Sequence, residues 1–133
     1  MKSVMRVLGL GAVTLLAWSS ASFAQVPAGN HYLCHKVGDL KVPAKFVSQP
    51  GLSVVDQVGG FTIEAKKPFL LCDPASKNGS IITDPTLHYC CYKAKSATKV
   101  KANFDVTDQF GPLRLGTKKP FLLCNPCSKA PAP

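Results

Sequence analysis

Two of the six cysteines have the spacing of a redox motif. In a Cys-x-x-Cys arrangement such as Cys124-Asn-Pro-Cys127, one thiolate attacks a disulfide and the second resolves the mixed intermediate. Such motifs normally open a helix, whose dipole lowers the pKa of the first thiol. Here the motif follows an apolar segment and runs directly into Ser-Lys-Ala-Pro-Ala-Pro. A small thiol-disulfide oxidoreductase that uses Cys124 and Cys127 is therefore the alternative function and not the leading one.

The other side chains that could bind a metal or catalyse a reaction do not form a convincing site. Thiolates or histidines could hold zinc, but the thiols of an exported protein are expected to be oxidised. His31 and His88 begin two equivalent segments, which favours a structural hydrogen bond over a catalytic base. The chain has no Gly-x-Ser-x-Gly elbow, phosphate-binding loop or carboxylate pair set apart from turns. We therefore predict that the protein is not an enzyme and uses no metal or cofactor.

Positive charge is the clearest sign of a binding function. The 133 residues include 16 Lys and Arg against 7 Asp and Glu, which gives a formal net charge of +9. Four lysines at odd-numbered positions would line one face of an uninterrupted strand. This predicted basic stripe comprises Lys93, Lys95, Lys99 and Lys101. Lysines that only solubilise the protein or protect a sheet edge are the other interpretation.

An anionic partner follows from this charge. The predicted partner is an anionic glycan, a lipid headgroup or an acidic surface protein. Nucleic acid is not expected, because the exported chain would contain a single arginine and no interleaved aromatic side chains. Two further basic clusters, Lys66-Lys67 and Lys118-Lys119, add to the positive surface.

The first 24 residues are typical of a secretory signal peptide. Lys2 and Arg6 form a positive head, and an apolar stretch spans 7–18. Ser22-Phe23-Ala24 places small side chains where signal peptidase requires them, so we expect cleavage after Ala24. The remaining 25–133 would keep a charge of +7, because two basic and no acidic residues are removed. No apolar run approaches the roughly 20 residues of a spanning helix, so we predict a secreted or periplasmic protein without a transmembrane segment.

The exported chain contains two copies of one unit. Lys-Lys-Pro-Phe-Leu-Leu-Cys at 66–72 recurs letter for letter at 118–124. The same offset superimposes Asp56-Gln57-x-Gly59 on Asp108-Gln109-x-Gly111, and a slightly larger offset superimposes His-Tyr-x-Cys-x-Lys at 31–36 on 88–93. The first copy therefore spans 31–77 and the second spans 88–129. A linker at 78–87 with Asn-Gly-Ser and Asp-Pro pairs is expected to be a surface connection.

The pattern within each copy resembles a known repeat. His-x-x-Cys-[Tyr/His]-Lys, Asp-Gln-x-Gly and Lys-Pro-x-x-Leu-Cys-[Asp/Asn]-Pro are similar to a repeat domain of unknown function found in exported bacterial proteins, often in tandem. The resemblance covers both copies and so nearly all of the exported chain. It implies no activity for any residue. Cys90 and Cys127 depart from the pattern and resemble additions to the second copy.

Alternation of apolar and polar residues predicts strands. Phe61, Ile63 and Ala65 alternate with polar residues, and an Asx-type turn at Asp108 with Gly111 at positive φ can close a hairpin. No segment shows a capped helical period. A unit of under fifty residues buries too little apolar surface to fold alone. We predict an all-β, disulfide-stapled sandwich or flattened barrel in which two pseudo-symmetric copies share one domain at 25–133, with two separate beads as the alternative.

The duplication narrows the fifteen possible pairings of six cysteines. A bridge internal to the ancestral unit must join Cys34 to Cys72 in the first copy and Cys91 to Cys124 in the second. The added cysteines occur together in the second copy, which favours a third bridge between Cys90 and Cys127. In an antiparallel ladder, facing residues have a nearly constant sum of positions, and the two pairs of the second copy satisfy this.

Overall fold

The structure, a computed structural model, describes residues 26–133, so the predicted signal peptide at 1–24 lies outside the described residues. These residues form strands and no helix, which confirms the all-β class. It follows that no described helix is long and apolar enough to cross a membrane. The seven strands are β1 (His31–Lys36), β2 (Gln49–Val55), β3 (Gly60–Ala75), β4 (His88–Ser96), β5 (Asn103–Asp108), β6 (Gly111–Gly116) and β7 (Leu122–Cys127).

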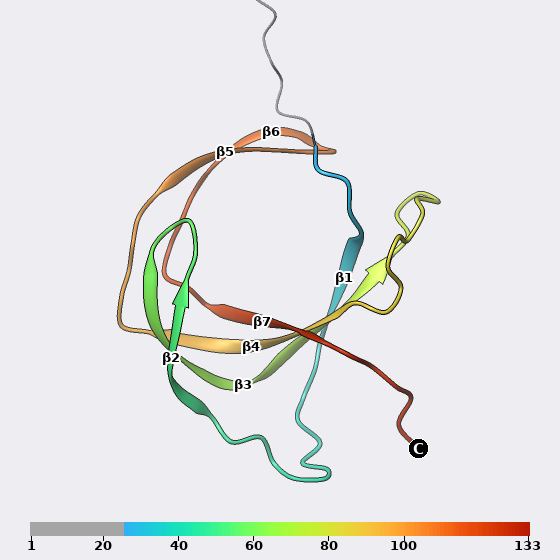
Figure 1. The fold of residues 1–133 in the computed structure, drawn as a ribbon, viewed down its shortest axis with the longest axis vertical. Coiled ribbons are helices and arrows are strands. Elements are labelled where there is room, and N and C mark those ends of the chain that lie inside the picture. The colour runs from blue at the N-terminus through green and yellow to red at the C-terminus, as the bar shows by residue number, and fades with distance from the viewer. Residues whose placement is uncertain (1–25) are drawn as a thin grey trace, which may run out of the picture.

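Five of the strands form one curved antiparallel sheet (Figure 1). The order is β1-β3-β4-β7, and β2 also pairs with β3. Because β3 has 16 residues, β1 pairs with its second half and β2 with its first half, while β4 pairs along its other edge. The pairing of β3 with β4 joins the segments 31–77 and 88–129 in a single sheet.

A small core lies on one face of β3. Phe61, Ile63 and Ala65 are 6%, 5% and 4% exposed, whereas Thr62 between them is exposed. This is the half-buried strand that the alternation predicted. The other buried apolar residues among those described are Cys72 and Cys91. A core of this size removes little apolar surface from water, so covalent bridges must contribute much of the stability.

The segment 88–129, the predicted second copy, differs from 31–77 in its hairpin. β5 and β6 form a separate two-stranded sheet that lies across from the curved sheet (Figure 1). The predicted Asx-type turn is confirmed, because the carboxylate of Asp108 accepts the Phe110 N–H at 2.8 Å and Gly111 has φ 115°. Leu113 and Leu115, which align with the buried Phe61 and Ile63, are each 51% exposed. β6 and β7 are two strands where the first copy has the continuous β3.

Three disulfides join the strands, and they are the three pairs expected from the duplication. Cys34–Cys72 links β1 to β3 and Cys91–Cys124 links β4 to β7, each between directly opposed residues. The Cys72 and Cys91 sulfurs are 4.0 Å apart, so these two bridges form one row across four strands, here called the sulfur row. The third bridge, Cys90–Cys127, also joins β4 to β7.

Candidate functional site

The predicted basic stripe is divided by the end of β4. Lys93 and Lys95 lie on the strand, but Lys99 and Lys101 lie in the segment that connects it to β5. The strand ends at Ser96, which is 1% exposed and whose hydroxyl accepts the Thr98 N–H at 3.1 Å. The premise of an uninterrupted strand was therefore wrong, and the four lysines do not share one strand face.

The two lysines on β4 have partners within the sheet. The Lys93 ammonium lies 4.5 Å from the centre of the Phe69 ring, a cation–π distance. Lys95 stands opposite Glu64 in the β3–β4 register. The pKa of Glu64 is lowered chiefly by its hydrogen bond with Lys66 at 3.0 Å, and the charge of Lys95 adds to this effect. The charges on this part of β4 therefore have neighbours that attract them.

Lys99 and Lys101, which lie beyond β4, line a hollow together with a second pair of lysines. An open hollow of about 600 Å³ is lined by four lysines together with Gly116 and Thr117. We call this the lysine hollow, and its four lysines are Lys99, Lys101, Lys118 and Lys119. No acidic residue lines it. Four like charges in one hollow repel one another, and a bound anion would relieve that repulsion.

Thr117 holds the two lysine-bearing segments together. Its hydroxyl accepts the Ala102 N–H at 2.9 Å and donates to the Val100 carbonyl at 3.2 Å. Its own N–H donates to the Ala102 carbonyl at 2.8 Å. The segment 99–101 is thereby fixed beside 118–119. No local pattern identifies Thr117, although the recurring motifs align it with the buried Ala65 and so place a polar side chain at an apolar position.

Replacing Thr117 by valine should loosen the lysine hollow. The variant keeps the size of the side chain but leaves the Ala102 N–H without its acceptor, so we expect a loss of about 1 kcal/mol in the free energy of unfolding. Hydrogen exchange of the Ala102 amide should become faster. Thr62→Val, at an exposed position of β3, is the matched control. Unchanged exchange at Ala102 would contradict the positioning role of the hydroxyl.

The cysteines of the Cys-x-x-Cys motif do not pair with each other. Both lie on β7, where Cys124 is bonded to Cys91 and Cys127 to Cys90. No free cysteine occurs among the described residues. The helix that normally follows such a motif is absent from the described chain, which ends after β7 in a segment without regular structure.

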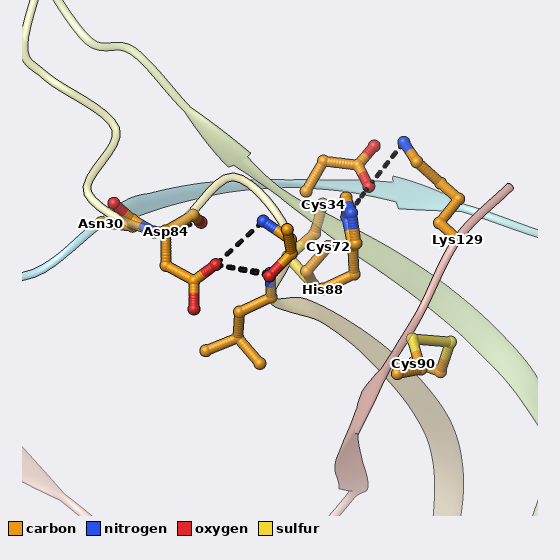
Figure 2. A network of polar contacts seen from close by, with 11 residues as sticks. Asn30, Cys34, Cys72, Asp84, His88, Cys90 and Lys129 are labelled. Carbon is orange, nitrogen blue, oxygen red and sulfur yellow. Dashed lines mark hydrogen bonds and ion pairs between the residues drawn. A yellow bond between two sulfur atoms is a disulfide. The ribbon is translucent and has the colours of Figure 1, made fainter.

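A polar network ties the second copy to the first next to the sulfur row. His88 is 9% exposed and its Nδ1 donates to the Asp73 carboxylate at 2.9 Å, while Lys129 contacts the same oxygen at 2.9 Å (Figure 2). The hydrogen bond from Lys129 is the main reason that the pKa of Asp73 is lowered, and His88 adds to it. His31 accepts a hydrogen bond from the Gln109 amide at 3.0 Å. Both histidines therefore form hydrogen bonds, although with different partners in the two segments.

The linker is anchored beside this network. Asn30 accepts the Thr83 N–H at 2.7 Å and donates to the Asp84 carbonyl at 2.8 Å. The Asp84 carboxylate then accepts the N–H groups of Thr86 and Leu87 at the entry to β4 (Figure 2). These contacts fix the start of β4 and hence the placement of His88.

Comparisons with models of protein families, with curated proteins and with solved structures found no match to this chain. Among residues 26–133, no three His, Cys, Asp or Glu side chains are grouped so as to hold a metal ion. The candidate site is the lysine hollow, because four lysines and no acidic residue line it.

Proposed function

We propose that this protein is an exported, non-catalytic binding module of the cell envelope or the extracellular space. Its partner is anionic: a glycan, a lipid headgroup or an acidic surface protein. The observation that carries the proposal is the lysine hollow, in which Thr117 fixes two pairs of lysines side by side without an acid among them. Three disulfides support export, because such bonds persist in oxidising compartments.

The alternative, a thiol-disulfide oxidoreductase, has less support. Its two thiols would have to form and break a bond with each other, but Cys124 and Cys127 are each bonded to a cysteine of β4. Thiol-disulfide exchange at Cys124 would also break its bond to Cys91. Because Cys91 is 1% exposed and its sulfur packs against that of Cys72, this would disrupt the sulfur row. Stapling of the sheet accounts for all six cysteines.

Binding to an immobilised polyanionic glycan tests the proposal with two matched variants. Each replaces two lysines by glutamine and so removes the same charge: Lys99→Gln with Lys101→Gln, and Lys93→Gln with Lys95→Gln. We expect the Lys99→Gln with Lys101→Gln variant to bind the glycan roughly tenfold more weakly, a loss of about 1.4 kcal/mol, because it removes two of the four positive charges of the lysine hollow. The second pair should change it less than about twofold, since those charges already face Phe69 and Glu64.

Salt dependence and stability are the controls. Affinity for the wild-type protein should fall steeply as salt is raised, because exposed charges are screened beyond about 10 Å at 0.1 M ionic strength. The thermal midpoint of the Lys99→Gln with Lys101→Gln variant should stay close to that of the wild-type protein, since both lysines are exposed and exposed lysines carry little folding energy. If both variants lost the same affinity for the glycan, binding would depend on the overall charge of the protein and not on the lysine hollow. The proposed site would then be wrong.

A further inference from the structure

The two outer strands of the curved sheet each have an edge without a partner. Among residues 26–133, β1 pairs only with β3 and β7 pairs only with β4, so these strands end the order β1-β3-β4-β7. The unpaired N–H and C=O groups of an edge strand are a template to which another strand can add. Each end of the sheet therefore offers a place for one more strand.

The two free edges belong to the same kinds of strand that already pair inside the sheet. β1 and β4 carry the recurring His-Tyr-x-Cys-x-Lys motif, and β3 and β7 carry the recurring Leu-Leu-Cys. β1 pairs with β3 in the register in which β4 pairs with β7, since Cys34 stands opposite Cys72 and Cys91 opposite Cys124. The inner pairing of β3 with β4 thus joins one strand of each kind. The outer edges of β7 and β1 again present one strand of each kind.

The cysteines at the inner pairing are buried, whereas their counterparts at the outer edges are exposed. Cys72 and Cys91 are 5% and 1% exposed, and their sulfurs are 4.0 Å apart. Cys34 and Cys124 occupy the same motif positions but are exposed, and Leu33 beside Cys34 is 59% exposed. The sulfur row therefore ends on each side in an exposed cysteine, and a strand added at either edge would continue it.

The inner pairing also sets a lysine over an aromatic ring, and both residue types recur at the outer edges. The Lys93 ammonium of β4 lies 4.5 Å from the centre of the Phe69 ring of β3. Lys36 at the end of β1 and Phe121 just before β7 occupy the corresponding motif positions. Both are exposed, the phenylalanine to 63%. Contact between the two edges would bring them together as a second cation–π pair.

We propose that copies of this protein associate head to tail, with β7 of one copy pairing antiparallel with β1 of the next. This junction continues the β3–β4 pairing and is independent of the proposed anion binding. Because the contact joins two different edges, each added copy leaves an edge free for another. Transferred by the recurring motifs, the β3–β4 register sets Leu122, Leu123 and Cys124 opposite Cys34, Leu33 and Tyr32 of the next copy.

Sedimentation velocity of the oxidised protein over a range of concentrations measures this association. The mean mass of the wild-type protein should rise steadily with concentration. Lys36→Glu sets a carboxylate against the Phe121 ring and should weaken association about fivefold or more, the factor that an exposed cation–π contact contributes. Lys45→Glu makes the same change of charge at an exposed position between β1 and β2, and should alter association less than about twofold.

Two proline variants block one edge each. The Val37 N–H donates to a carbonyl of β3 at 3.0 Å, and the Phe121 carbonyl accepts an N–H of β4 at 2.9 Å. Because successive residues of a strand direct their N–H groups to opposite edges, Lys36 and Leu122 direct theirs to the free edges. Lys36→Pro and Leu122→Pro each remove one of these groups, at the last residue of β1 and the first of β7. Neither variant should associate alone, whereas their mixture should form a heterodimer and nothing larger, because each supplies the edge that the other lacks.

A mean mass that stays at that of the monomer at every concentration would overturn the inference. Association of either proline variant that equals the wild-type level, or a mixture that forms no heterodimer, would place the contact on another surface and overturn it as well. Circular dichroism and thiol titration check that the proline variants fold, and Lys36→Glu tests the same junction if one of them does not. None of these outcomes bears on anion binding, because no residue that lines the lysine hollow belongs to β1 or β7.

Discussion

Replacing Cys91 and Cys124 together by alanine should lower the free energy of unfolding by about 4 kcal/mol or more. The chain-entropy model gives about 4 kcal/mol for a loop of this length, since the two cysteines are 33 residues apart. A further loss is expected because Cys91 is 1% exposed and its sulfur packs against that of Cys72. Removing it leaves a cavity at the middle of the sulfur row. Chemical or thermal denaturation of the variant measures the loss.

The third bridge provides the matched control for this prediction. Cys90 and Cys127 join the same two strands and are 37 residues apart, so loop entropy alone predicts an equal loss for the two double variants. We expect the Cys90→Ala with Cys127→Ala variant to be the more stable of the two, because both of these cysteines are only partly buried. Equal stabilities would show that packing within the sulfur row adds nothing to the covalent constraint.

Asp73→Ala should lower the free energy of unfolding by about 1–3 kcal/mol at neutral pH, because it leaves the buried His88 without its acceptor. Asp73→Asn retains an acceptor for His88 but removes the charge that faces Lys129, so its loss should be smaller. Chemical denaturation of the three proteins at pH 7 compares them. A loss in the asparagine variant equal to that in the alanine variant would assign the whole effect to the charge.

The pKa of Asp73 predicts how the difference in stability between the wild-type protein and Asp73→Asn changes with pH. The pKa of Asp73 in the folded protein lies below its ordinary value of 3.8. A lowered pKa contributes stability that is present above 3.8 and is lost as pH falls through the folded-state pKa. The advantage of the wild-type protein over Asp73→Asn should therefore shrink as pH falls below 3.8. An advantage that survives unchanged in strong acid would contradict the assigned contact between the Asp73 carboxylate and Lys129.

The recurring sequence motifs made the disulfide pairs predictable. An internal repeat relates equivalent cysteines, so the pairs 34–72 and 91–124 follow without knowledge of the strands between them. Alternation at Phe61, Ile63 and Ala65 is a local signal, because a strand with one buried face must repeat every two residues. The Asx turn at Asp108 is equally local, since its donor and acceptor are two residues apart.

The lysine hollow could not be predicted from sequence, because it depends on contacts between residues that are far apart in the chain. Odd-numbered lysines predict a stripe only if the strand continues, and β4 stops where the hydroxyl of Ser96 bonds to Thr98. The lysine hollow forms because Thr117 reaches back fifteen residues to Ala102. The same residue marks the break between β6 and β7 that makes the second copy unlike the first. A serine or threonine that replaces an apolar residue between repeats is the signal that would have identified this position.

The sulfur row and the third bridge determine how the chain would carry a mechanical load. Tension applied at the two ends passes through Cys34–Cys72, along 72–90, and through Cys90–Cys127, because covalent bridges are shorter paths than the loops they close. Residues 35–71 and 91–126 lie outside that path. The lysine hollow belongs entirely to the second of these shielded loops. A protein tethered between two surfaces could thus be stretched without its candidate site being drawn out along the line of force.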